Sequence, residues 1–131
     1  MGISAGYIQA NNINSHTIIE NHPQIIEKLK LWAIDKPNVT IIEGDWHDVK
    51  DSLSIYDGIF YDTYGEQDWS KFATELSSLT KLGTKVTWWN NNPEQSTIHN
   101  IDNVVYENIS VDPPPNSYFN SDIYYLPKKE F

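Results

Sequence analysis

The 131-residue sequence contains no cysteine. This absence excludes a disulfide framework and any metal site built on thiolates, and it fits a protein of a reducing compartment. No apolar run is long enough to cross a bilayer, and the first residues do not have the pattern of a signal peptide. We therefore expect a cytoplasmic protein.

Basic residues are scarce, because nine Lys and Arg stand against eighteen Asp and Glu, which gives a net charge of −9. Binding to nucleic acid usually requires a stripe of cations that neutralises successive phosphates. An anionic membrane surface would also have to attract a basic region of the protein. We therefore expect neither nucleic acid nor a membrane as a partner.

The remaining composition is that of a folded protein. Hydrophobic residues make up 39% of the chain and aromatic residues 13%, which argues against disorder despite the net charge. A chain of this length buries roughly two-thirds of the surface that it exposes when unfolded. We therefore expect one domain with a real core over residues 1–131.

Three apolar runs each end on an acidic residue, at Glu20, Asp45 and Asp62. Each run has the β-branched and aromatic content of a buried strand, and the segment 23–33 between the first two has helical periodicity. This repeat of strand, helix and strand predicts an α/β fold with a parallel sheet. Because the carboxyl ends of parallel strands share one edge, we expect the three carboxylates to converge on one crevice. The pattern indicates a nucleoside site.

The expected elements follow from the same periodicities and from the turn residues between them. A short helix over 1–10 places Ile3, Tyr7 and Ile8 on one face, and Gly83 stops a later helix. The other predicted elements are strands over 16–20, 39–43, 56–62 and 84–89, helices over 23–33 and 68–79, and an antiparallel pair of strands over 104–111 and 122–126.

Three motifs in the same order resemble the guanidinoacetate N-methyltransferase group and the related δ-nitrogen class of protein arginine N-methyltransferases. They are His-Thr-Ile-Ile-Glu-Asn-His-Pro over 16–23, Asn-Val-Thr-Ile-Ile-Glu-Gly-Asp-Trp-His-Asp-Val over 38–49, and Tyr-Asp-Gly-Ile-Phe-Tyr-Asp-Thr-Tyr-Gly-Glu over 56–66. The likeness extends to Val-Asp-Pro-Pro over 111–114 and to Tyr118. The resemblance implies a Rossmann-like class I methyltransferase fold that uses S-adenosylmethionine and releases S-adenosylhomocysteine.

One part of the family pattern has no counterpart in this sequence. Of the family's first strand and its Glu-Val-Gly-Phe-Gly-Met-like turn, only Met1 and Gly2 correspond to the end, and the substrate cap that precedes them is also missing. By resemblance, the missing strand lies between those at 16–20 and 56–62. We therefore expect a fragment, a truncated reading frame or a natural remnant, and unpaired strand edges favour a homodimer.

The cofactor residues implied by the resemblance lie at the strand ends. Glu20 can accept hydrogen bonds from both ribose hydroxyls, because an ionised carboxylate offers two acceptor oxygens. Asp45 can accept from the adenine amino group, and Trp46 can offer its ring to the base. The alternatives are a solvated charge at Glu20 and core packing for Trp46. By resemblance, the predicted cofactor contacts are completed by Asn21, His22, Met1, Gly2 and Asp62. No metal site is predicted, because His16, His22, His47 and His99 have no ligand spacing.

Asp62 is the candidate catalytic residue. Its carboxylate can bind a guanidino group through two parallel hydrogen bonds, orient the attacking nitrogen and accept the proton that leaves. The alternative is an aspartate that only caps the next turn. By resemblance, Tyr64 and the asparagines at 90–92 contact the substrate.

Three functions are therefore open from the sequence. The first is an S-adenosylmethionine-dependent N-methyltransferase that acts on a guanidino or amine nitrogen of a small molecule or of arginine. The second is a catalytically inactive relic or assembly partner. The third, a nucleotide-dependent oxidoreductase, is disfavoured because no Gly-x-Gly-x-x-Gly occurs.

Overall fold

The computed structural model describes residues 3–63, 67–89, 101–110, 112 and 123–131. The chain divides into two compact units, Met1–Leu53 and Ser54–Phe131. The prediction of a single domain over 1–131 is not tested by this division and stays a prediction. In the described part of the chain, no helix has the length and apolar character that a membrane span requires.

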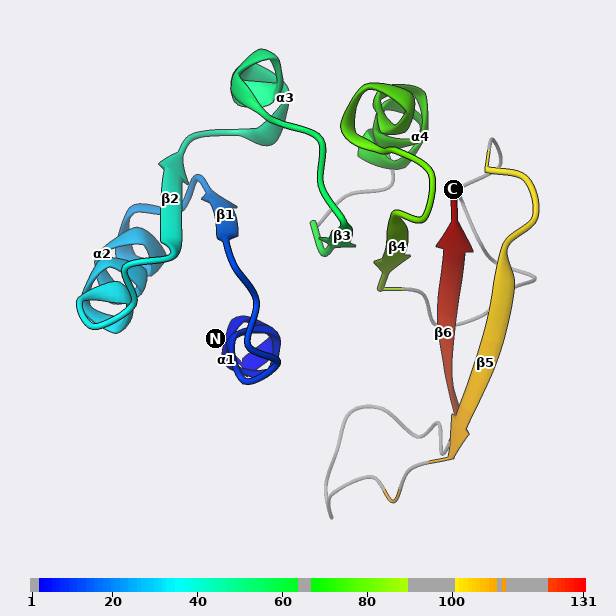
Figure 1. The fold of residues 1–131 in the computed structure, drawn as a ribbon, viewed down its shortest axis with the longest axis horizontal. Helices are drawn as coiled ribbons and strands as arrows, with labels where there is room; N and C mark the ends of the chain where they lie inside the picture. The colour runs from blue at the N-terminus through cyan, green and yellow to red at the C-terminus, as the bar shows by residue number, and fades with distance from the viewer. Residues whose placement is uncertain (1–2, 64–66, 90–100, 111, 113–122) are drawn as a thin grey trace. The chain divides into compact units, whose positions relative to one another are not determined.

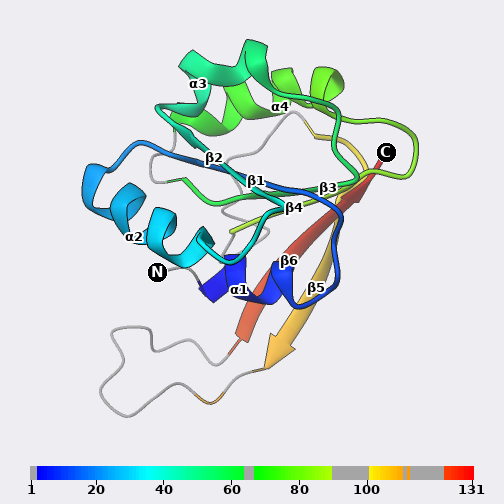
Figure 2. The same cartoon turned by 60° about the vertical axis from the view of Figure 1, so that its left-hand side comes forward.

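The first unit alternates helices and strands as predicted. Its elements are α1 (Ile3–Gln9), β1 (His16–Glu20), α2 (Pro23–Ala33), β2 (Val39–Glu43), α3 (Trp46–Val49) and a short 3₁₀ turn, Lys50–Ser52. β1 and β2 pair in parallel, from His16 opposite Val39 to Glu20 opposite Glu43 (Figure 2). The two strands therefore end at the same edge, as the sequence predicts.

The sequence of α2 explains why this segment forms a helix and which of its sides is buried. Pro23 occupies the first turn, where its missing N–H costs no hydrogen bond, and Ile26 and Leu29 are buried at helical spacing. On the exposed side, Lys30 lies 2.8 Å from a carboxylate oxygen of Glu43 at the end of β2. This hydrogen bond to Glu43 raises the pKa of Lys30. This ion pair connects α2 to β2.

α1 forms as predicted, but Ile3 and Tyr7 of its predicted apolar face are exposed. Ala5 is the buried residue of the helix, whereas Ile3 and Tyr7 are 70% and 72% exposed and Ile8 is half-buried. A small residue can approach its neighbours closely, and the helix therefore packs through Ala5. The apolar residues at 3 and 7 remain on the open side.

The second unit contains the other sheet. Its elements are β3 (Gly58–Tyr61), α4 (Gln67–Leu79), β4 (Lys85–Trp88), β5 (Val105–Ser110) and β6 (Ile123–Glu130), and the strand order is β3-β4-β6-β5 (Figure 1). β3 and β4 are parallel, while β6 is antiparallel to both of its neighbours. The predicted terminal antiparallel pair is confirmed, with β6 longer than expected because it also pairs with β4.

A proline lies inside β6 without breaking it. Pairing with β4 runs from Glu130 to Lys128 and stops before Pro127, which has no N–H to donate. The Pro127 carbonyl instead accepts a hydrogen bond of 2.7 Å from Thr87 Oγ1. The hydrogen bond from the Thr87 side chain thus takes the place of the next backbone hydrogen bond between β4 and β6.

The core of the second unit lies between α4 and the β3–β4 pair. Phe72, Leu76 and Leu79 are buried along α4, and the Phe72 ring stacks on Tyr61 of β3 with centroids 3.9 Å apart. Tyr61 is paired with Trp88 across the sheet, and Trp88 is 1% exposed. Burial of each such side chain contributes about 1.5–3 kcal/mol, which fixes α4 on this face.

Gly83 does not end α4 as predicted. The helix ends at Leu79, and Gly83 has φ +87° in the turn that leads into β4. Thr84 stabilises that turn, because its buried Oγ1 accepts from Lys81 N at 2.9 Å and donates to the Tyr56 carbonyl at 2.7 Å. The glycine therefore permits the turn after the helix and not the helix end.

We expect Thr84→Val to destabilise the protein by about 1–3 kcal/mol, because valine keeps the shape but leaves the Lys81 N–H and the Tyr56 carbonyl unpaired. Urea unfolding measures the change. Thr74→Val is the matched control, since Thr74 Oγ1 bonds only within the exposed surface of α4. Equal losses in both variants would show that the Thr84 hydroxyl has no special role.

The pairing of the described strands leaves an edge strand in each sheet. Among the described residues, β1 pairs with β2 and with no other strand, and β3 pairs only with β4. β1 and β3 are thus each the edge of a different sheet.

Candidate functional site at the carboxyl ends of the strands

Glu20 is the last residue of β1, and its carboxylate is held by the loop that follows. Glu20 Oε1 accepts hydrogen bonds from the backbone N–H groups of Asn21 and His22, both at 2.9 Å. One oxygen of the carboxylate therefore caps the loop that follows β1. Its second oxygen still provides acceptor sites, so the loop contacts leave Glu20 able to bind a hydroxyl.

Asp45 is brought to the same end of this sheet by an extension of the parallel pairing. Gly44 N donates to the Glu20 carbonyl at 2.9 Å, one residue beyond the last pair of the ladder. Asp45 then caps α3, with its Oδ1 accepting from His47 N at 2.9 Å. Glu20 and Asp45 thus lie at the ends of adjacent strands, each with one oxygen used in a local cap.

Gly44 is a site residue that reasoning from the sequence missed. Its φ is +150°, and a Cβ at this position would lie 3.1 Å from Val49 Cγ1. The glycine lets the chain turn from β2 into α3 directly beside Glu20. The signal was present in the sequence as a glycine between a strand-ending glutamate and a helix-capping aspartate.

We expect Gly44→Ala to destabilise the first unit by about 1–3 kcal/mol, through its positive φ and the contact with Val49. Thermal unfolding monitored by circular dichroism measures this loss. Gly6→Ala is the matched control, because a Cβ at Gly6 meets nothing within 4 Å and lies in a helix, where alanine is favoured. If Gly44→Ala leaves the unfolding temperature unchanged, the proposed constraint on the loop is wrong.

Trp46 and the two residues after Glu20 differ in accessibility. Trp46 is 9% exposed, and its ring centroid lies 3.8 Å from that of His47, with the planes tilted by 34°. This burial fits the alternative of core packing for Trp46. Asn21 and His22 are exposed beside Glu20 and are accessible to a ligand. Their contacts with a cofactor stay predictions.

Asp62 follows β3 directly and is exposed at the carboxyl end of that strand. The pairing of the sheet continues to this point, because Trp89 N donates to the Tyr61 carbonyl at 3.3 Å. Asp62 belongs to the second unit, whereas Glu20 and Asp45 belong to the first. Its convergence with them stays a prediction.

Several predicted site residues lie outside the described part of the chain. They are Met1, Gly2, Tyr64 and the asparagines at 90–92. Within the described residues, no group of three or more His, Asp or Glu side chains is arranged to hold a metal ion.

Comparison with solved structures defines the class of fold. The chain is similar to a precorrin-6y C5,15-methyltransferase from Geobacter metallireducens, with a TM-score of 0.67, 15% identity, and coverage of 87% of this chain and 65% of that one. It is also similar to Aeropyrum pernix fibrillarin with natively bound S-adenosyl-L-methionine, with a TM-score of 0.63, 14% identity, and coverage of 87% and 54%. The fold is the Rossmann-like fold of class I methyltransferases, as predicted.

The family follows from the sequence comparison. The model of the guanidinoacetate N-methyltransferase family matches residues 1–88, and the chain belongs to this family. S-adenosyl-L-methionine is the cofactor of this class of enzymes. The predicted resemblance is thereby confirmed.

Named relatives are fungal proteins. Protein arginine N-methyltransferase 2 of Aspergillus oryzae is 40% identical over 83 residues, which cover 57% of this chain and 20% of that protein. The Saccharomyces cerevisiae protein of the same name is 41% identical over 73 residues, covering 50% and 18%. The chain thus spans about a fifth of the length of the relatives that it matches.

Proposed function

We propose that this chain is an S-adenosylmethionine-dependent N-methyltransferase domain that acts on a guanidino nitrogen, either of a small molecule or of arginine. The observation that carries the proposal is the shared end of β1 and β2, where Glu20 and Asp45 follow adjacent parallel strands. This edge lies within the segment that matches the methyltransferase family. Ligands of open α/β sheets bind at such carboxyl ends.

The two carboxylates suit the two polar parts of a nucleoside. The oxygen of Glu20 that the Asn21 and His22 amides leave available can accept from a ribose hydroxyl. The second oxygen of Asp45 can likewise accept from the adenine amino group, while its Oδ1 holds the start of α3. Since both loops are already fixed by backbone hydrogen bonds, little ordering is needed when the cofactor binds.

Asp62 is proposed to hold the methyl acceptor. The nitrogen lone pair attacks the methyl carbon of the sulfonium, the bond from that carbon to sulfur breaks, and S-adenosylhomocysteine leaves. The guanidinium loses one proton in this step, and an exposed carboxylate can both orient the nitrogen and take up that proton. Attack requires the reacting atoms at about 3–3.5 Å in line, which paired hydrogen bonds to a planar group favour.

The acceptor can be identified with labelled methyl donor. Wild-type protein is incubated with methyl-labelled S-adenosylmethionine and either guanidinoacetate or an arginine-containing peptide, and we expect label on a guanidino nitrogen of at least one of them. Ureidoacetate is the matched control, because it keeps the shape of guanidinoacetate but has no cation for Asp62 to bind. Cofactor binding without transfer to either acceptor would instead support the inactive alternative.

A further inference from the structure

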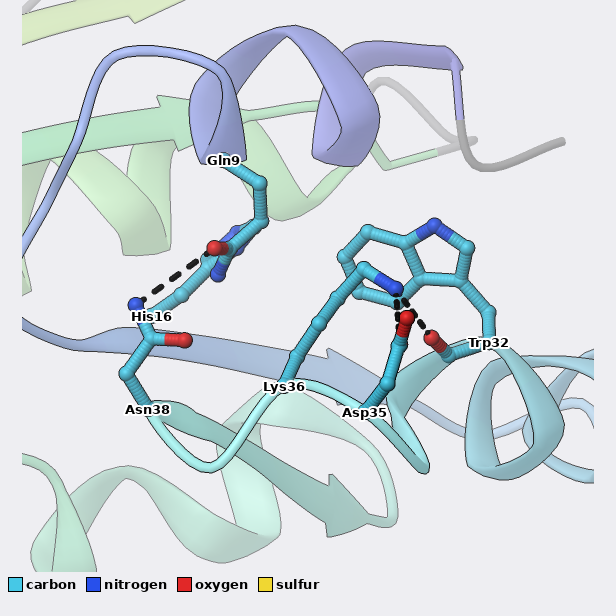
Figure 3. Close-up of polar contacts among 6 residues, drawn as sticks. All are labelled: Gln9, His16, Trp32, Asp35, Lys36 and Asn38. Atoms are coloured by element: carbon cyan, nitrogen blue, oxygen red, sulfur yellow. Dashed lines mark hydrogen bonds and ion pairs between the residues drawn. The ribbon is translucent and has the colours of Figure 1, made fainter.

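A second polar cluster lies at the opposite, amino-terminal end of the β1–β2 sheet (Figure 3). Gln9 ends α1, His16 begins β1, and Asn38 immediately precedes β2. Gln9 Nε2 lies 3.2 Å from His16 Nδ1, while Asn38 Nδ2 donates to the Ile13 carbonyl at 2.9 Å and to Gln9 Oε1 at 3.4 Å. We name Gln9, His16 and Asn38 the α1 latch, because they connect this helix to both strands.

α1 is short, and most of its described side chains are not buried. It is seven residues long, and Ala5 is its buried residue, while Ile3 and Tyr7 are mostly exposed. Isolated helices of this length are not stable in water. The position and the helical state of α1 therefore depend on its contacts with the rest of the unit, which include the α1 latch.

In the part of the chain that the structure describes, no neighbouring group of His16 stabilises a charged ring. The ring of His16 lies nearly perpendicular to that of Trp32 of α2, with ring centroids 6.4 Å apart. Lys36 lies over Trp32 and is paired with Asp35. No carboxylate is ion-paired with His16 among the residues that the structure describes. Burial lowers the pKa of His16 below its ordinary value of 6.5.

We propose that the latch is a proton-controlled attachment, which holds α1 while His16 is neutral and releases it when His16 binds a proton. Neutral His16 can accept from Gln9 at Nδ1, whereas the protonated ring carries N–H groups on both nitrogens and cannot. Rotation of the Gln9 amide does not restore the network. It would turn the Gln9 NH₂ group toward Asn38 Nδ2, which is also a donor.

The direction of the pH effect follows from the state of the ring in the two forms. The released form has a more exposed His16 and therefore a higher proton affinity than the latched form. The latch is consequently complete above the ordinary pKa of histidine and weakens as the pH falls through the pKa of the docked ring. This device needs neither cofactor nor substrate, so it stands or falls separately from the proposed function.

Hydrogen exchange measured by NMR tests the proposal on the whole chain. Ala10 N donates to the Gly6 carbonyl at the end of α1, and Gly44 N, at the far end of the sheet, is an internal reference. Between about pH 7.5 and 5.5 we expect the protection factor of Ala10 to fall about 3- to 10-fold relative to Gly44, the change that one lost hydrogen bond produces. His16→Asn keeps an acceptor for Gln9 without titrating, so its ratio of protection factors should not change.

Two results would overturn the proposal. One is an unchanged Ala10 to Gly44 ratio in the wild type, and the other is the same fall in His16→Asn. If His16→Asn does not fold, the wild type still decides the question, because the ring signal of His16 can be followed in the same NMR samples. The pH at which half of the Ala10 protection is lost must then equal the pH midpoint of the His16 ring signal. A midpoint that differs from that of His16 contradicts the latch.

Discussion

Replacing Asp62 by asparagine is expected to reduce methyl transfer by about 10²–10⁴-fold while leaving cofactor binding unchanged. Asparagine keeps the size of the side chain but cannot accept a proton or form a charge-assisted pair with a guanidinium. Asp62 is exposed after β3, so the substitution should not disturb the core of the second unit. Turnover is measured with labelled S-adenosylmethionine, and binding is measured by calorimetry with S-adenosylhomocysteine.

Asp57→Asn is the matched control for this prediction. Asp57 precedes β3 at its other end, where its exposed carboxylate pairs with Lys81 at 2.6 Å, so its loss should have only a small effect. Methylation by Asp62→Asn at the rate of the wild type would refute the catalytic role of Asp62. Equal losses in both variants would indicate a general effect of charge near β3.

Replacing Glu20 by glutamine should weaken S-adenosylhomocysteine binding by about 10- to 100-fold, because a hydrogen bond to a charged group contributes about 1.5–3 kcal/mol. The amide oxygen of glutamine can still accept from the Asn21 and His22 N–H groups, so the loop keeps its form. The variant therefore separates the binding role of Glu20 from its role in closing the strand. Calorimetric titration gives the two dissociation constants.

Glu27→Gln controls for the loss of one negative charge in the same unit. Glu27 is on the exposed side of α2, 3.6 Å from Lys30, and is not part of the proposed site. We expect its affinity for S-adenosylhomocysteine to equal that of the wild type. If Glu20→Gln also binds normally, Glu20 only closes β1 and the ribose contact is wrong.

The strands and the helices α2 and α4 could be predicted because their sequences have strong periodicity. β-branched runs such as Thr17–Ile19 and Thr40–Ile42 pack well only in extended, half-buried positions, and Ile26 and Leu29 share one face of a helix. The errors occurred where local pattern is weak. α1 packs through Ala5 and not through its larger residues. Gly83 lies in a turn that is stabilised by a hydrogen bond from Thr84 to Tyr56, which is distant in sequence.

The positions of Glu20 and Asp45 at the strand ends were predictable, but their hydrogen bonds were not. Acidic residues at the ends of parallel strands follow from the run pattern, and the parallel register of β1 and β2 confirms that Glu20 and Asp45 end adjacent strands. The sequence could not show that each carboxylate uses one oxygen to cap its own loop, because a cap depends on the backbone angles of the turn. For Trp46 the sequence left core packing open beside a contact with the base, and the burial of its ring fits core packing.

A titration of the ¹⁵N-labelled wild-type protein with S-adenosylhomocysteine tests most directly whether the ends of β1 and β2 bind the nucleoside. We expect saturable binding, with the largest chemical-shift changes at the amides of Asn21, His22 and Gly44, beside the Glu20 and Asp45 carboxylates. Absence of binding at millimolar ligand, or shifts confined to residues away from the ends of β1 and β2, would contradict the claim that this edge of the sheet binds the nucleoside.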